Sequence, residues 1–185
     1  MSPGDFGRVS VLVVTHEHYD HLDEGLVRSI YERERCKVVA DVQSAGRLSR
    51  YIAKEDLKTL AQDGKVEFDA FTLFGEKSIH PAFRPISVVV ETKDKLRVYH
   101  SSDSAPFDAM RHIPQKYGVI DIAFCTVGIA PGATPKTGAE IAKLVRPILA
   151  IPYHGSKLRE FCEFLRGEEG IECRIISQGE TVILP

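Results

Sequence analysis

A short segment near the start of the chain gathers side chains that bind metals. Residues 15–21 run Thr-His-Glu-His-Tyr-Asp-His and hold three of the seven histidines of the chain. Neutral imidazole and carboxylate are the ligands that suit zinc and similar divalent ions. In a tight loop His16 and His18 can point to one side while Asp20 and His21 point to the other, which favours two metal ions over one. We call residues 15–21 the histidine loop.

The elements on either side of the histidine loop decide where it lies in the fold. Residues 10–14 form a continuous apolar, β-branched run, which predicts a strand buried on both faces. Residues 23–35 begin with acids and carry Leu26 and Ile30 four positions apart, which predicts an amphipathic helix. The histidine loop is therefore expected at the end of a strand, where functional sites are usually built.

The rest of the chain alternates between strand-like and helix-like segments. Strands are expected at 38–40, 86–91, 96–100, 120–126, 148–153, 173–176 and 181–184, with successive short strands between 66 and 85. Helices are expected at about 44–60, at 139–145 and after residue 156. Thr137 and Glu140 have the spacing of a capping box for the second helix, and Ser156 is the expected cap of the last. We predict a single α/β domain that covers residues 1–185.

Composition and charge restrict the partners and the location. The formal net charge of −2 gives no general attraction to phosphate backbones or anionic membranes. No apolar run approaches the roughly 18 residues that a membrane span needs, and the start lacks the pattern of a signal peptide. The four cysteines are scattered without a Cys-x-x-Cys pair, so we expect buried thiols in a reducing cytoplasm rather than disulfides or a thiolate metal site.

The histidine loop and three downstream segments resemble the metallo-β-lactamase superfamily, whose hallmark is a strand-ending His-x-His-x-Asp-His loop. His80, in Ser-Ile-His-Pro, lies ahead of the predicted hairpin, as the third histidine of the family does. Asp103 follows the hairpin, with Ser102 where the family usually has glycine. His154 follows the last core strand, and residues 121–154 are similar to the ascorbate-6-phosphate lactonases.

The resemblance implies a four-layer αββα sandwich and a dinuclear metal centre. It implies that His16, His18 and His80 bind one ion, that Asp20, His21 and His154 bind the second, and that Asp103 bridges them. Zinc is the expected metal, with manganese or iron as alternatives. A metal-bound hydroxide is the implied nucleophile, and Asp20 is the implied catalytic residue that orients it.

The family normally has several strands before its histidine loop, whereas only about a dozen residues precede it here. We therefore expect an N-terminally truncated form of the sandwich. An uncovered apolar sheet face favours association, so a homo-oligomer or a partner chain over that face is also expected.

These features predict a metal-dependent hydrolase of a small, anionic substrate of the ester or lactone type. Gly155, Ser156 and Lys157 could hold a carboxylate or phosphate at a helix N-terminus, and His100 could orient Asp103 through a hydrogen bond. One alternative is a phosphodiesterase of the ribonuclease Z type, although the charge and the lack of clustered basic and aromatic residues argue against nucleic acid. The other is a metal-binding protein without turnover.

Overall fold

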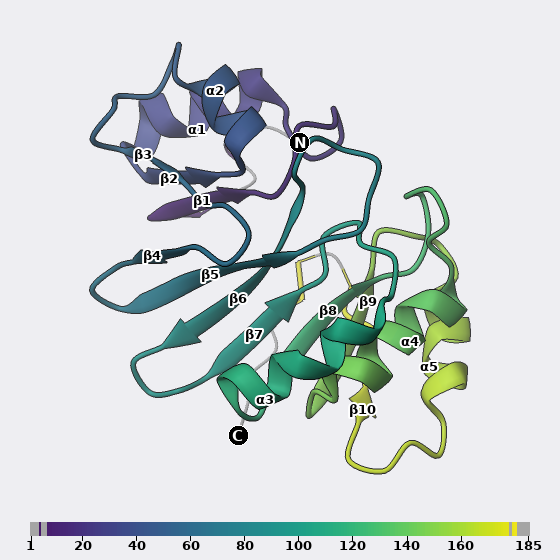
Figure 1. The fold of residues 1–185 in the computed structure, drawn as a ribbon. Coiled ribbons are helices and arrows are strands. Elements are labelled where there is room, and N and C mark those ends of the chain that lie inside the picture. The colour runs from purple at the N-terminus through teal and green to yellow at the C-terminus, as the bar shows by residue number, and fades with distance from the viewer. Residues whose placement is uncertain (1–3, 5–6, 178, 181–185) are drawn as a thin grey trace. The chain divides into compact units, whose positions relative to one another are not determined.

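The computed structural model describes residue 4, residues 7–177 and residues 179–180, and it has an α/β fold with five α-helices among them (Figure 1). The chain divides into two compact units, which are described separately. Unit 1 holds residues 1–77 and 81–88, and unit 2 holds residues 78–80 and 89–185. The boundary falls inside strand β6. That residues 1–185 form a single domain stays a prediction.

Unit 1 begins with a parallel three-stranded sheet in the order β1-β2-β3. Its elements are β1 (Val11–Val14), α1 (Glu24–Glu34), β2 (Lys37–Ala40), α2 (Val42–Leu48) and β3 (Leu57–Thr59). Parallel neighbours are joined by right-handed crossovers, which places α1 and α2 on the same face of this sheet (Figure 1). Asp23 caps α1 by accepting a hydrogen bond of 2.9 Å from the Leu26 N–H.

Two expectations for unit 1 need correction. The strand β1 was expected to be buried on both faces, but Val13 is 38% exposed, because β1 is an edge strand and only β2 is central. The predicted helix 44–60 ends at Leu48. Residues 57–59 form β3 instead, because they pair in parallel with Val38–Ala40 and so satisfy their backbone groups on a neighbouring strand.

The rest of unit 1 is an antiparallel hairpin of β4 (Lys65–Glu67) and β5 (Phe71–Lys77), which confirms the short strands predicted there. Strand β6 (Ile86–Thr92) starts next to β5. The Ile86 N–H donates a hydrogen bond of 3.1 Å to the Thr15 carbonyl and so ties the start of β6 to the histidine loop.

Unit 2 contains the end of β6 and a run of strands in the order β6-β7-β8-β9-β10. Its other elements are β7 (Arg97–His100), a 3₁₀ turn (Asp108–His112), α3 (Ile113–Tyr117), β8 (Ile122–Thr126), α4 (Pro135–Val145), β9 (Leu149–Tyr153), α5 (Leu158–Leu165) and β10 (Glu172–Cys173). The Thr92 N–H donates to the Leu96 carbonyl at 3.0 Å and closes the predicted hairpin between β6 and β7. Strands β7 to β10 are parallel, and α4 and α5 lie on one face of them (Figure 1).

Both predicted caps in unit 2 are wrong in position. The capping box of α4 pairs Thr134 with Thr137, not Thr137 with Glu140, and the helix begins at Pro135. Proline is favoured at the first helical position because it has no N–H to satisfy there. Helix α5 begins after Lys157 without a side-chain cap, so Ser156 does not cap it.

The cysteines divide into two kinds. Cys36 and Cys125 are buried thiols, as expected. Cys162 of α5 and Cys173 of β10 form a disulfide with a Cα–Cα distance of 5.5 Å, so the expectation of four free thiols is wrong for this pair. The pairing depends on the turn that brings β10 back beside α5, and cysteine spacing in the sequence does not reveal that turn.

The predicted strand 173–176 is confirmed only at its start, as β10, and the predicted strand 181–184 lies outside the described residues. No helix in the part of the chain that the structure describes is long and apolar enough to cross a membrane.

Two glycines inside helices make a matched pair for testing the packing. A Cβ atom at Gly138 of α4 would lie 2.5 Å from the Thr126 carbonyl oxygen, whereas a Cβ at Gly46 of α2 would meet no atom within 4 Å. We expect Gly138→Ala to lower the free energy of unfolding by about 1–3 kcal/mol and Gly46→Ala to raise it by about 0.5–1 kcal/mol. Denaturant titration of both variants measures these changes, and two shifts of the same sign would contradict the packing of α4 on β8.

Candidate metal centre

The seven predicted metal ligands divide between the two units. Unit 1 holds four of them, in the histidine loop: His16, His18, Asp20 and His21. Unit 2 holds the other three: His80, Asp103 and His154.

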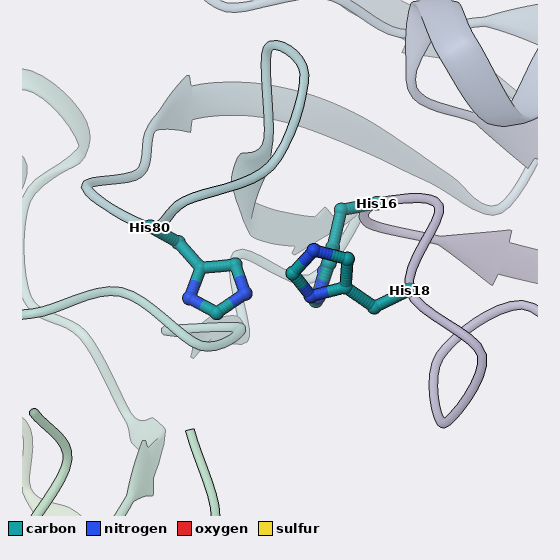
Figure 2. Close-up of side chains that lie close together, drawn as sticks. All are labelled: His16, His18 and His80. Carbon is teal, nitrogen blue, oxygen red and sulfur yellow. The ribbon is translucent and has the colours of Figure 1, made fainter. Parts of the chain in front are cut away.

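In unit 1 the three imidazoles of the histidine loop lie against one another. The ring of His16 is fully buried, with its centroid 4.8 Å from that of His18 and 4.0 Å from that of His21. Figure 2 shows His16 and His18 on the loop that follows β1, together with the labelled His80 of unit 2. Asp20 lies on the same loop and is exposed. The strand-end position predicted for these four side chains is confirmed.

The loop is tight because its own backbone and the neighbouring helices hold it. The N–H groups of His21 and Leu22 both donate to the His18 carbonyl, at 2.9 and 2.7 Å. Arg47 of α2 donates to the Glu17 carbonyl at 3.1 Å and forms an ion pair with Glu24 at the start of α1. The carboxylate of Glu17 in turn accepts a hydrogen bond of 2.9 Å from the Phe83 N–H. Glu17 therefore anchors the loop, although it lies among metal-binding residues.

In unit 2 the Asp103 carboxylate lies between two histidines. It is 3% exposed; its Oδ1 is 3.0 Å from His154 Nδ1, and its Oδ2 is 3.9 Å from His80 Nε2. Each carboxylate oxygen thus faces a different imidazole. Carboxylate and imidazole are both side-chain types that bind divalent metals.

The strand order of unit 2 explains why these residues meet. Asp103 lies just beyond the carboxyl end of β7, and His154 follows β9 directly. Parallel strands place their carboxyl ends at one edge of the sheet, where sites of α/β folds are usually found. The segment that carries His80 is fixed to this edge by two hydrogen bonds, from the Ile79 N–H to Ser104 Oγ at 2.9 Å and from the Ala105 N–H to the Ile79 carbonyl at 2.8 Å.

The side-chain types of the seven predicted ligands suit a divalent metal. Imidazole nitrogens and carboxylate oxygens are the only donors predicted, and they are the types that hold zinc, manganese and iron in proteins. A carboxylate as buried as that of Asp103 needs a positive partner, because an ionised group loses its hydration on burial. A bound cation would supply such charge in addition to the two neighbouring histidines.

The remaining predicted site residues lie next to this group in unit 2. His100 ends β7, and its Nδ1 accepts a hydrogen bond of 3.1 Å from the Ser102 N–H. A cavity of about 420 Å³ lies between the N-terminal ends of α4 and α5, and some of its lining residues directly follow His154 in the chain. Its lining includes the three predicted substrate-binding residues: Gly155, Ser156 and Lys157. Lys157 also pairs with Glu160 at 3.3 Å.

Tyr153 is a residue of this region that the sequence analysis missed. Its hydroxyl donates a hydrogen bond of 2.5 Å to the Ser102 carbonyl, next to Asp103. Burial raises the pKa of Tyr153 well above its usual value, so the phenol stays a donor at neutral pH. Its place directly before His154 is the only hint of this role in the sequence.

The α/β elements and the histidine loop at a strand end define a protein of the metallo-β-lactamase-like fold. A solved metallo hydrolase from the archaeon Ignicoccus hospitalis has this fold, with a TM-score of 0.78 and 20% identity over 94% of this chain and 78% of that one. The model of the β-lactamase superfamily domain matches residues 2–155, which include all seven predicted ligands, and the chain belongs to that family.

Two relatives cover nearly all of the chain. A UPF0173 metal-dependent hydrolase of Thermofilum pendens is 29% identical over 100% of this chain and 83% of its own length. Another, from Staphylococcus epidermidis, is 26% identical over 94% of this chain and 82% of its own length. The predicted superfamily is thus confirmed, while the similarity to lactonases and the N-terminal truncation stay predictions.

Proposed function

We propose that this protein is a hydrolase that acts on a small substrate with two divalent metal ions, of which zinc fits the donors best. The observation that carries the proposal is the Asp103 carboxylate, whose two oxygens face His154 and His80 separately. The UPF0173 metal-dependent hydrolases to which the chain is similar support the same reaction class.

The ligands divide into two sets in this proposal. The family resemblance assigns His16, His18 and His80 to the first ion. It assigns Asp20, His21 and His154 to the second ion, with Asp103 as the bridge between the two ions.

The chemistry requires little beyond these groups. A bound divalent ion lowers the pKa of water to near 7 and polarises the substrate oxygen that carries the developing charge. Asp20 is exposed on the histidine loop. Its carboxylate would accept a hydrogen bond from the attacking water and orient it. The side chain of Asp103 is almost fully buried.

The residues that line the cavity next to His154 in the chain indicate the chemical class of the substrate. Two lysines and one acid line it, so its charge is positive by one: Lys136, Lys157 and Glu160, together with the apolar Ile129 and Phe164. Cationic and apolar groups in one cavity favour a small molecule with a carboxylate or phosphate at one end and an apolar body. An anionic ester or lactone meets that description.

The test is a count of bound metal combined with a substrate panel. Protein purified without metal and then loaded with zinc or manganese is expected to hold two ions per chain, measured by mass spectrometry of the metals. It is then assayed against lactones, carboxylic esters, thioesters and a phosphodiester. Hydrolysis of any one class that disappears on chelation supports the proposal. Two bound ions with no turnover on the panel would instead favour a metal-binding protein without catalysis.

The role of Lys157 is tested by its effect on KM. We expect Lys157→Ala to raise KM about tenfold for an anionic substrate and to leave KM for a neutral analogue unchanged, because one charge-assisted hydrogen bond contributes about 1.5–3 kcal/mol. Lys65→Ala removes the same charge from β4 of unit 1 and serves as the control. Equal effects on both substrates would show that Lys157 does not recognise the anion.

A further inference from the structure

The residue before Asp103 has a backbone conformation that needs support. Ser102 has φ +51°, in the left-handed region that non-glycine residues rarely adopt, and it is fully buried. Such a conformation persists only where the surrounding structure determines it, and it is often found at functional sites. Hydrogen bonds from neighbouring side chains supply that support here.

Both backbone polar groups of Ser102 are bonded to side chains. Its N–H donates to Nδ1 of His100 at 3.1 Å. Its carbonyl accepts the Tyr153 hydroxyl at 2.5 Å and the Ser101 hydroxyl at 2.8 Å. His100 ends β7 and Tyr153 ends β9, so side chains from two strands hold the two peptide groups that flank the Cα atom of Ser102.

The side chains of His100 and Tyr153 also contact each other. The ring centroids of His100 and Tyr153 are 4.6 Å apart, and the His100 ring contacts Phe124 of β8 with a centroid distance of 5.8 Å. Ser101 Oγ accepts a further hydrogen bond of 3.1 Å from the Thr126 N–H. The turn after β7 is therefore fixed to β8 and to β9 by side chains that bind no metal in the proposed centre.

Tyr153 connects two ligand-bearing segments. It directly precedes His154, and its hydroxyl bonds the residue that directly precedes Asp103. The two ligands themselves touch, with His154 Nδ1 3.0 Å from Asp103 Oδ1. A shift of the Ser102 peptide would move the Asp103 carboxylate relative to His154.

We propose that Tyr153 and His100 are positioning residues that hold the backbone of Ser102 in its left-handed conformation. In this way they keep the Asp103 carboxylate between His154 and His80. We call these two side chains and their hydrogen bonds to Ser102 the clamp. Its functional meaning rests on the proposed metal centre. The clamp acts on the backbone, which distinguishes it from a direct hydrogen bond to a ligand side chain. The serine at position 102 makes the clamp necessary, because glycine would adopt the same conformation without help.

The test uses zinc alone and measures its affinity by competition with a chromophoric chelator. Tyr153→Phe removes only the hydroxyl and is expected to weaken zinc binding about 10- to 100-fold, the usual effect of losing a group that orients a ligand. Adding Ser102→Gly to Tyr153→Phe is expected to restore the affinity to within about threefold of the wild type, because glycine needs no clamp. Ser102→Gly alone is expected to bind zinc like the wild type.

A second tyrosine separates positioning from general destabilisation. Tyr31 of α1 also donates a hydrogen bond, of 2.8 Å, to Asp56 in unit 1. Tyr31→Phe is expected to lower the thermal midpoint and leave the zinc affinity unchanged. If Tyr153→Phe binds zinc as tightly as the wild type, or if Ser102→Gly fails to rescue it, the clamp is refuted while the metal centre stands. If the wild-type chain binds no zinc, both proposals fall together.

Discussion

Replacement of Asp103 with Asn is expected to lower kcat/KM on the order of 10³-fold and to reduce the bound metal below two ions per chain. The amide keeps the shape of the carboxylate but has only one oxygen, so it cannot face His154 and His80 with an oxygen each. Stabilisation of developing charge by a metal is worth several kcal/mol, and each 1.36 kcal/mol is a factor of ten in rate. Steady-state kinetics and a metal count measure the two effects.

The matched control for this substitution is Asp108→Asn. Asp108 begins the 3₁₀ turn a few residues further on, and its side chain is almost fully exposed. The variant makes the same change of charge outside the proposed centre and is expected to keep both ions and full activity. If the Asp103→Asn variant behaved like this control, Asp103 would not be the bridge between the two ions.

Replacement of Phe161 with Ala is expected to lower the free energy of unfolding by about 3–5 kcal/mol, the range found for large aromatic residues in cores. Phe161 of α5 has no exposed surface, and its ring packs against Gly138 of α4, where a Cβ would come within 3.3 Å of Cδ2. For a chain of this length the change corresponds to a thermal midpoint about 10 °C lower. Calorimetry or a denaturant titration measures it.

Phe164, one turn along the same helix, provides the comparison. It is 45% exposed, so Phe164→Ala is expected to change the free energy of unfolding by less than about 1 kcal/mol. Equal losses for the two variants would mean that α5 does not pack through the face that carries Phe161.

The local arrangement of the histidine loop could be predicted because its signals are local. A β-branched run predicts β1, the acids and the four-residue spacing predict α1, and the loop between them is too short to lie elsewhere. The four donors of unit 1 follow from that order alone. Asp103 and His154 could be predicted only through the resemblance to the family, because their meeting depends on which strands are neighbours.

The features that were mispredicted depend on contacts between distant residues. Residues 57–59 have no strong strand signal, and they form β3 because β2 offers them backbone partners. The disulfide of Cys162 and Cys173 depends on a turn that brings β10 beside α5. The hydrogen bond from Tyr153 to Ser102 spans 51 positions, and no periodicity or motif relates the two residues. The position of the α4 cap is a different case, because Thr134 and Thr137 have a local spacing and were overlooked in favour of a similar pair.

The backbone of His154 limits how this protein can vary. With φ +58° it has the same unfavourable left-handed backbone as Ser102. At position 102 glycine would ease that conformation without burying another polar group, so its substitution there is expected to be tolerated in evolution. At position 154 a substitution that relieved the backbone would also remove the imidazole. A library that varies both codons and selects for metal binding should therefore return glycine as well as serine at 102 but histidine alone at 154. The chain carries the unfavourable backbone at 154 for as long as it keeps its metal.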